Sequence, residues 1–83
     1  MPTKKTKAAA RLSNIEELID DGGEITIGAV GSIPCAATAS DESNCLAMLQ
    51  RRESESLQQL LQRLDTAIAR AWEEGIFTDE INI

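Results

Sequence analysis

The clearest pattern of apolar residues lies near the C-terminus, in SLQQLLQRLDTAIARAWEEG at positions 56–75. Apolar side chains recur there every three or four residues, which is typical of one face of an α-helix. They are Leu57, Leu60, Leu61, Leu64, Ala67, Ile68, Ala71 and Trp72. Ser56 and Gln59 have the spacing of a capping box, and Gly75 suits a left-handed C-cap. We therefore predict a long amphipathic helix that buries one face, Trp72 included, against a flat surface.

A second, shorter helix is predicted in RLSNIEELIDDGG at positions 11–23. Ser13 followed by Glu16 has the spacing of a capping box, and Gly22 and Gly23 end the pattern. The apolar residues of this segment are Ile15, Leu18 and Ile19. A helix of about two turns needs tertiary contacts to be stable, so we expect it to pack on the rest of the domain.

The segment between the two helices alternates with a period of two, as half-buried strands do. In EITIGAVG, Ile25, Ile27 and Ala29 alternate with polar or small residues. A second extended segment, SIPCAATAS, begins near Pro34, a residue that strand starts tolerate. CLAMLQRR over 45–52 is predicted as a third strand, although its Leu, Ala and Met residues would equally suit a helix. The intervening DESN has the side chains that close turns.

These elements predict one α+β domain of two layers: a short N-terminal helix, a three-stranded antiparallel sheet, and one long amphipathic helix packed on one sheet face. The domain is expected to span residues 12–76, between a flexible basic arm at 1–11 and an acidic tail at 77–83. The tail suits either a short fourth strand or a segment that orders on a partner. A core of this size rarely contributes more than about 3–5 kcal/mol, so a staple, a metal or a partner subunit is expected.

One long helix covers one face of a sheet, so the other face is predicted to be bare. With a loop at 40–44, Ala39 stands opposite Cys45, and this register turns three apolar side chains away from the helix. Exposed apolar patches on small proteins are typical of interfaces. We therefore predict a homodimer contact on this face, with an apolar side chain of the tail as a clasp at its edge. The predicted interface residues are Val30, Leu46, Met48 and Phe77.

Cys35 and Cys45 are the only cysteines in the chain. Zinc sites need four ligands, so two cysteines without histidine do not make one in a single chain; a site of four thiolates shared by a dimer is the alternative. In the predicted register the two thiols lie about four sheet rungs apart, which is too far for a disulfide. We predict that both are small buried hydrophobic residues at either end of a hairpin.

The net charge of −6 conceals a segregation along the chain. Residues 1–11 contain no acid, and their basic residues are Lys4, Lys5, Lys7 and Arg11. The rest of the chain has four arginines against all fourteen acids, a balance of −10, and such a body repels phosphate backbones. The arm is predicted to be a flexible, solvated terminus, and contact with DNA or RNA is the alternative.

Catalytic chemistry is not expected from these residues. Histidine is absent and no lysine follows Lys7, which removes the usual partners of a nucleophile. The glycines of GGEITIGAVG interrupt a strand and do not open a helix, so they do not form a dinucleotide-binding turn. We therefore predict no catalytic, cofactor-binding or metal-binding residue, no small-molecule substrate and no enzyme.

The glycine-flanked strands, the IPC segment at 33–35 and the amphipathic helix capped by Ser56 resemble HicB-type antitoxins. The resemblance covers about half of the chain and implies a partly open sheet that dimerises and masks a toxin. Two features differ, because the Pro-Gly-Cys turn of those proteins is missing here and an extra strand intervenes. The chain is not assigned to that family on these residues.

The sequence therefore predicts a small acidic, non-catalytic binding or regulatory module that acts by protein–protein contact as a homodimer. The alternative is a nucleic-acid-associated, antitoxin-like regulator that uses the basic arm. A third interpretation, an acidic inhibitor that mimics a nucleic acid, depends on charge alone. Neither a signal peptide nor a membrane-spanning apolar run is recognised, so a cytoplasmic location without membrane contact is expected.

Overall fold

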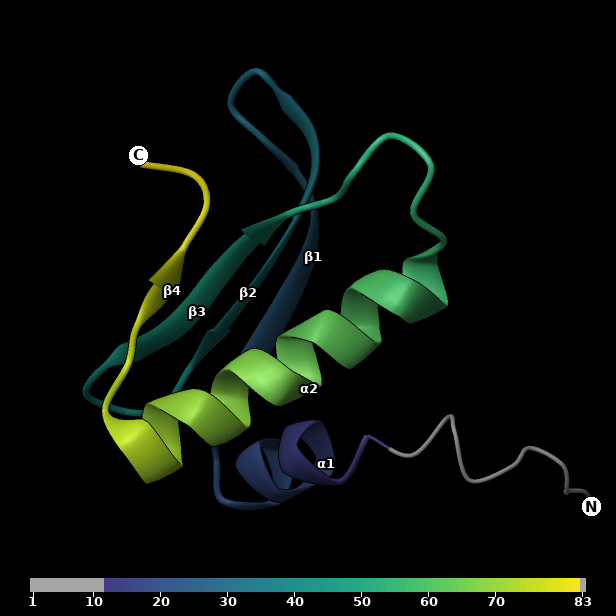
Figure 1. The fold of residues 1–83 in the computed structure, drawn as a ribbon. Coiled ribbons are helices and arrows are strands. Elements are labelled where there is room, and N and C mark those ends of the chain that lie inside the picture. The colour runs from purple at the N-terminus through teal and green to yellow at the C-terminus, as the bar shows by residue number, and fades with distance from the viewer. Residues whose placement is uncertain (1–11, 83) are drawn as a thin grey trace, which may run out of the picture.

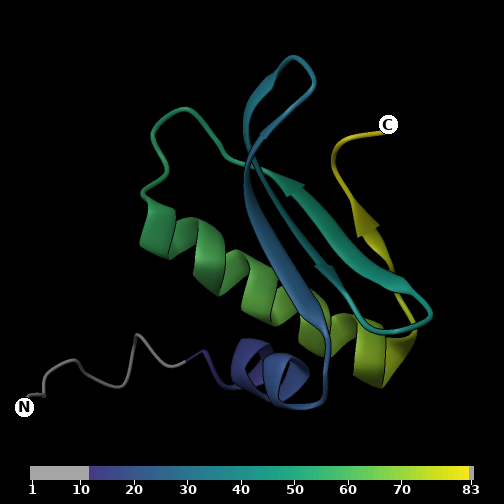
Figure 2. The same ribbon diagram turned by 180° about the vertical axis from the view of Figure 1, so that it is seen from behind.

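The computed structural model describes residues 12–82 and shows two layers, a four-stranded sheet with two helices on one of its faces (Figures 1 and 2). In chain order the elements are α1 (Ser13–Asp20), β1 (Glu24–Val30), β2 (Ile33–Ser40), β3 (Cys45–Gln50), α2 (Leu57–Glu74) and β4 (Thr78–Asp79). The strands lie in the order β1-β2-β3-β4. The predicted α+β class is therefore confirmed. The predicted arm lies outside the described residues, and so do its basic residues Lys4, Lys5, Lys7 and Arg11.

The three predicted antiparallel strands form, and a fourth strand extends the sheet. β2 pairs antiparallel with both β1 and β3. β4 pairs with β3 in parallel, with Ala47 opposite Thr78 and Met48 opposite Asp79. A parallel neighbour requires a crossover connection, and α2 supplies it. The predicted three-stranded sheet was therefore too small by one short parallel strand, which lies in the tail where a short fourth strand was one of the two alternatives.

Helix α2 lies across β2 and β3 and begins and ends as predicted. The Ser56 hydroxyl accepts a hydrogen bond from the Gln59 amide, the Gln59 side chain accepts one from the Ser56 amide, and Gly75 closes the helix at φ 71°. The 18 residues of α2 span about 27 Å, whereas the 6 residues of β3 span about 20 Å. The ends of α2 therefore project beyond the strand. For this reason Leu57 and Trp72, both predicted on the buried face, are exposed, Trp72 at 39%.

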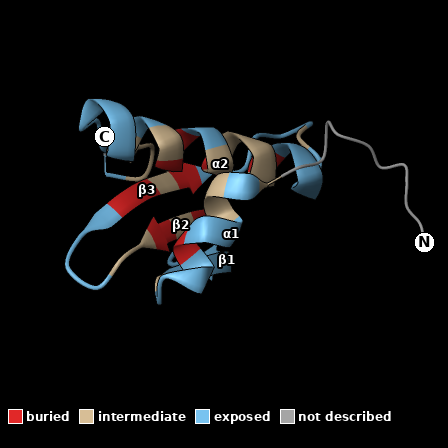
Figure 3. Ribbon diagram, turned by 90° about the horizontal axis from the view of Figure 1, so that it is seen from below, coloured by how far each residue is buried: buried red, intermediate tan, exposed pale blue. Residues whose placement is uncertain are grey.

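The buried residues lie between the two layers (Figure 3), and the core that they form is aliphatic and rich in alanine. Its buried residues are Leu18, Ala37, Ala39, Leu46, Ala47, Leu49, Leu60, Leu64, Ala67 and Ile68. Because an alanine side chain ends at Cβ, α2 can lie close to β2 and β3. The larger side chains of the helix, such as Leu64 and Ile68, then fill the space at the density typical of protein interiors.

The register of β2 and β3 differs from the predicted one by two residues along the ladder, and a bulge in β3 changes it again next to the turn. Ala39 stands opposite Ala47, not opposite Cys45, and Ser40 stands opposite Cys45. Leu46 is therefore the extra residue of the bulge, and it belongs to the core at 7% exposure. A bulge sets two residues of one strand against one of the other, so the alternation of faces fails there. The prediction that Leu46 faces solvent was wrong for this reason.

The turn that precedes the bulge is organised by one aspartate. Asp41 Oδ1 accepts hydrogen bonds from the amides of Ser43 and Asn44 at 2.8 and 2.7 Å, and the Asp41 amide donates to the Asn44 carbonyl at 2.9 Å. An aspartate side chain bonded to the backbone two or three residues on is a common turn device. These hydrogen bonds fix the turn at residues 41–44. The bulge follows at the start of β3, where Leu46 has no partner of its own on β2.

Helix α1 lies beside α2 and is capped by it. The helix begins at Ser13 itself and has no side-chain acceptor at its cap position, so the predicted Ser13–Glu16 capping box does not form. Instead, Asp65 on α2 accepts a hydrogen bond from the Ile15 amide at 2.8 Å and another from Asn14 Nδ2 at 2.9 Å. A carboxylate at a helix N-terminus is stabilising, because free amides and the helix dipole meet negative charge there.

Replacing Asp65 by alanine is expected to lower the free energy of unfolding by about 1–2 kcal/mol, the usual effect of losing a helix cap. The amide of Ile15 should exchange its proton faster, because it loses its acceptor. Urea denaturation and amide exchange measure the two effects. Thr66→Ala, on the exposed side of the same helix, is the matched control and should change stability by less than about 0.5 kcal/mol. An Asp65→Ala variant as stable as the control would contradict capping in trans.

Candidate interaction surfaces

The four residues predicted to form the interface do not form one patch. Val30 ends β1 and Phe77 precedes β4, so the two lie at opposite edges of the sheet. Both are exposed, Phe77 at 48%. Met48 is half-buried and stands opposite Thr38 on the face away from the helices, whereas Leu46 lies in the core.

The bare face of the sheet carries small and polar side chains. One row across the strands consists of Thr26, Thr38, Met48 and Asp79, and the next consists of Gly28, Ala36 and Gln50. Met48 is the large apolar side chain of these rows, and Asn82 Nδ2 approaches its sulfur at 4.0 Å. This face is therefore less apolar than predicted.

Large apolar side chains are exposed elsewhere on the described part of the chain. They are Ile19, Ile27, Val30, Leu57, Trp72, Ile76 and Phe77. The large buried side chains are Leu18, Leu46, Leu49, Leu60, Leu64 and Ile68. Seven large apolar side chains are thus exposed against six that are buried. Three of the exposed ones come from α1 and β1, and three from the end of α2 and the segment before β4.

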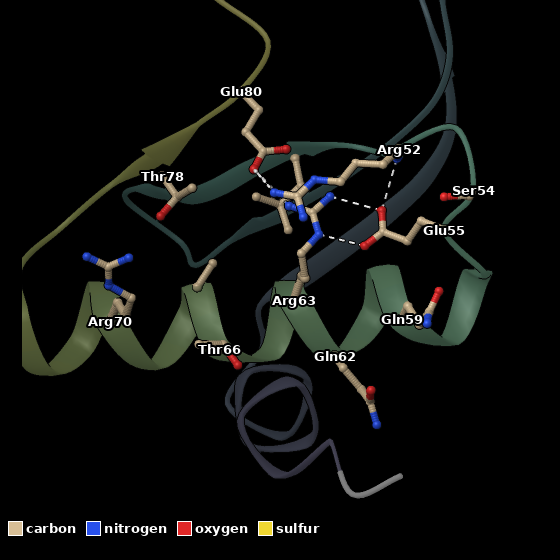
Figure 4. Close-up of a pocket in the computed structure, with 12 residues that line it drawn as sticks. Arg52, Ser54, Glu55, Gln59, Gln62, Arg63, Thr66, Arg70, Thr78 and Glu80 are labelled. Carbon is tan, nitrogen blue, oxygen red and sulfur yellow. Dashed lines mark hydrogen bonds and ion pairs between the residues drawn. The ribbon is translucent and has the colours of Figure 1, made fainter. Parts of the chain in front are cut away.

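Arg63 ties α2 to the chain segments on either side of it (Figure 4). Its Nε and Nη2 donate to the two carboxylate oxygens of Glu55 at 2.6 and 3.0 Å, and its Nη1 donates to Glu80 Oε2 at 2.8 Å. Nη2 also donates to the Gln50 carbonyl at 3.0 Å, and the Gln50 amide donates to Glu80 Oε1. One guanidinium therefore joins the end of β3, the loop before α2, and the tail that follows β4.

Glu55 is the carboxylate that this cluster perturbs most. Hydrogen bonds from Arg63 lower the pKa of Glu55 from 4.5 to about 2; partial burial opposes the shift, and the Arg52 amide adds a further hydrogen bond. The Glu55 side chain is 7% exposed, so salt screens the pair less than an open surface pair. Because the folded-state pKa is depressed, the pair stabilises the fold fully above pH 4.5 and loses this effect as the pH falls towards 2.

A polar groove of about 670 Å³ lies beside this cluster, between α2, β4 and the loop before α2. Its charged lining residues are Arg52, Glu55, Arg63, Arg70 and Glu80. Arg63 is bound by two carboxylates, Arg52 lies 4.0 Å from Glu80, and Arg70 lies 3.6 Å from Glu74. Acids of the same chain thus balance part of this positive charge: Arg63 is held closely, whereas the contacts of Arg52 and Arg70 are longer and lie at the exposed surface, where such pairs are weak.

A second hollow, of about 430 Å³, lies beside α1 and is acidic. Its lining residues include Glu17, Asp21, Asp41, Glu42 and the half-exposed Trp72. No lysine or arginine of the described residues lines it. Such a surface repels anions, so contact with a nucleic acid is disfavoured here.

Cys35 and Cys45 are both free thiols. Cys35 is half-buried and packs against the core, whereas Cys45, predicted to be buried, is exposed at the start of β3 opposite Ser40. Within residues 12–82, no three cysteine or acidic side chains are grouped as metal ligands would be. Neither helix in that range is long and apolar enough to cross a membrane.

Two features of these surfaces were not predicted, the Arg63 cluster and the exposure of Ile27. The contact of Glu55 with Arg63 had no helical signal, because Glu55 lies in the loop before α2 and the two residues are eight apart, whereas helix neighbours are three or four apart. The contact of Glu80 with Arg63 could not be predicted from nearby residues either. It forms because the chain after α2 runs back beside β3. Ile27 lies on the side of β1 that faces the helices. The residues next to it in the sequence give no sign that the helices do not extend far enough to cover it.

Replacing Glu55 by glutamine should lower the free energy of unfolding at neutral pH by about 1–3 kcal/mol, because hydrogen bonds to a charged group are lost. The difference from wild type should shrink as the pH falls from 4.5 towards 2, because the wild-type carboxylate then takes up a proton. Urea denaturation across this pH range measures it. Glu53→Gln, at an exposed position of the same loop, is the control. A difference between wild type and Glu55→Gln that is the same at every pH would contradict the assignment.

The chain was compared with protein families, curated proteins and solved structures. No family model, no curated protein and no solved structure matches the chain. Membership of a family, the HicB-type antitoxins included, is therefore not shown, and the function is inferred from the residues of this chain.

Proposed function

We propose that this protein is a small non-catalytic binding module that acts by contact with other proteins, with a second copy of itself as a partner. The observation that supports this function is the excess of exposed over buried large apolar side chains among the described residues, seven against six. Covering apolar surface is favourable by about 25 cal/mol per Å². A domain of this size buries a smaller fraction of its unfolded surface than a larger domain does, so association also adds stability.

Protein contact accounts for the polar groups better than catalysis does. Among residues 12–82 the buried residues are apolar, apart from the shielded side chain of Glu55, whereas a catalytic group is usually set apart from water in a pocket that tunes its pKa. The described carboxylate with the largest shift, Glu55, is held by Arg63 and the Arg52 amide. Its hydrogen bonds are internal to the fold, and this fits a structural role.

The alternative function, contact with DNA or RNA through the basic arm at 1–11, is supported by the sequence. The described surface adds little to it, because the arginines beside the polar groove are paired with carboxylates and the hollow beside α1 is acidic. We therefore place protein contact first.

The 83-residue chain is expected to have about twice its own mass of 9.0 kDa in sedimentation equilibrium over the micromolar range. Ile27→Ser and Phe77→Ser, tested separately, distinguish the two exposed groups, because the substitution at the contact should shift the protein towards monomer. Thr66→Ser, on the exposed side of α2, is the matched control and should leave the mass unchanged.

A monomeric mass over the whole concentration range would contradict the proposed homodimer. If that monomer bound duplex DNA or RNA, and if the binding weakened with salt and disappeared on deletion of residues 1–11, the alternative function would replace it.

A further inference from the structure

The two edges of the sheet are built differently. At one edge, β4 has 2 residues, and the Asp79 carboxylate accepts hydrogen bonds from the amides of Ile81 and Asn82, which turns the chain after the strand. At the other edge, β1 has 7 residues, EITIGAV, with no proline or lysine and one charged residue, Glu24, at its start. Short strands, charges and prolines are the devices that keep edges from pairing with another chain. In β1 the charge of Glu24 stands at the start and a bulge lies before Val30 at the end, so the segment between them carries none of these devices, and no described strand pairs with its outer side.

β1 also carries an apolar side chain that the helices leave uncovered. Ile25 and Ile27 pair with Ala39 and Ala37, which belong to the core, so both lie on the helix side of the sheet. Ile25 packs against the core, whereas Ile27 is 38% exposed. Figure 2 shows α1 beside the start of β1, while the strand continues past it. The helix layer therefore ends before the β1 edge does.

We propose that β1 pairs antiparallel with β1 of a second copy of the chain, which joins two four-stranded sheets into one continuous sheet. This inference rests on the proposed function and specifies the surface it uses. The two-fold axis is perpendicular to the sheet and passes midway between Thr26 and Thr26 of the partner subunit, so the helices of both subunits stay on one face. Ile25 then stands opposite Ile27 of the partner subunit, and Glu24 opposite Gly28 of the partner subunit.

The register follows from symmetry and from the shape of β1. A two-fold axis perpendicular to the sheet sets one residue opposite its own copy. The regular pairing of β1 with β2 covers Glu24–Gly28, and a bulge interrupts it before Val30. Thr26 is the centre of this regular segment. A centre at Ile27 would bring the bulge into the new ladder and leave its hydrogen bonds unpaired.

The side chains of β1 complement their own copies in this register. On the helix side, each Ile27 gains an isoleucine neighbour across the axis, which covers apolar surface that the monomer exposes. On the other face, the exposed Thr26 meets its copy, and opposed threonines are a favourable pair. Glu24 meets a glycine, so no like charges face each other, although the chain carries a net charge of −6. An edge free of self-repulsion on an acidic protein favours a second copy as the occupant.

Disulfide trapping tests the register. In a Cys35→Ala, Cys45→Ala background, Thr26→Cys sets two thiols on the axis, where opposed Cα atoms lie about 4.5–5.5 Å apart, within disulfide reach. Glu24→Cys is the matched control, because its own copy lies about 14 Å away along the strands. Under mild oxidation, most of the Thr26→Cys protein should run as a covalent dimer on a non-reducing gel, and most of the Glu24→Cys protein as a monomer.

Charge exchange at the same position tests the pairing without thiols. Thr26→Lys and Thr26→Glu each set like charges opposite each other, so each protein alone should be monomeric in sedimentation equilibrium. An equimolar mixture should regain the dimer, because opposite charges then meet. Thr66→Lys, exposed on α2, should remain dimeric.

The outcomes separate this inference from the proposed function. If wild type is a dimer but Thr26→Cys cross-links no more than Glu24→Cys, or if the mixture of charged variants stays monomeric, the β1 pairing is wrong and self-association stands. If wild type is monomeric at every concentration, both are wrong.

Discussion

The contact between α2 and the alanine-lined strands β2 and β3 determines the arrangement of the rest of the molecule. Ala37, Ala39 and Ala47 leave room for the helix over the middle of the sheet, where Leu64 and the other buried helix residues fill the core. The chain that leaves α2 returns beside β3, so β4 joins the sheet there in parallel. β1 is left at the far edge, where the short α1 is its only described helical neighbour in sequence. The exposed apolar side chains of β1 follow from this division of the sheet.

Arg63 fixes the path of the chain after α2, where the chain runs back beside β3. The aliphatic contacts of α2 would allow the tail to take several paths, but the guanidinium binds Glu55 before the helix and Glu80 after it. The Gln50 amide completes the cluster by donating to Glu80. The same hydrogen bonds use up the positive charge of Arg63, so the cluster stabilises the fold and does not form an anion site. An acidic chain thus concentrates several of its few cations where they hold segments together.

Elements with a strong local pattern could be predicted from the sequence, and contacts between distant segments could not. The capping box at Ser56 and the glycine at 75 define α2 by nearby residues, and both were predicted. The first helix was predicted with a local cap, but its acceptor is Asp65, about fifty residues away, and no periodicity reports such a contact. The bulge at Leu46 moved one predicted surface residue into the core, because a single extra residue reverses the alternation of a strand. Of the predicted interface, Val30 and Phe77 are exposed as expected, but at opposite edges.

We propose that the outer edge of β1 is covered by a second copy of the chain. Amide hydrogen exchange at several protein concentrations tests it most directly, because backbone groups of an edge strand are protected only while another strand pairs with them. Amides within 24–28 that point away from β2 should exchange more slowly as the concentration rises, while amides in the middle of α2 should show no such change. Exchange within 24–28 that is fast and independent of concentration, in a protein that is nevertheless dimeric, would contradict it.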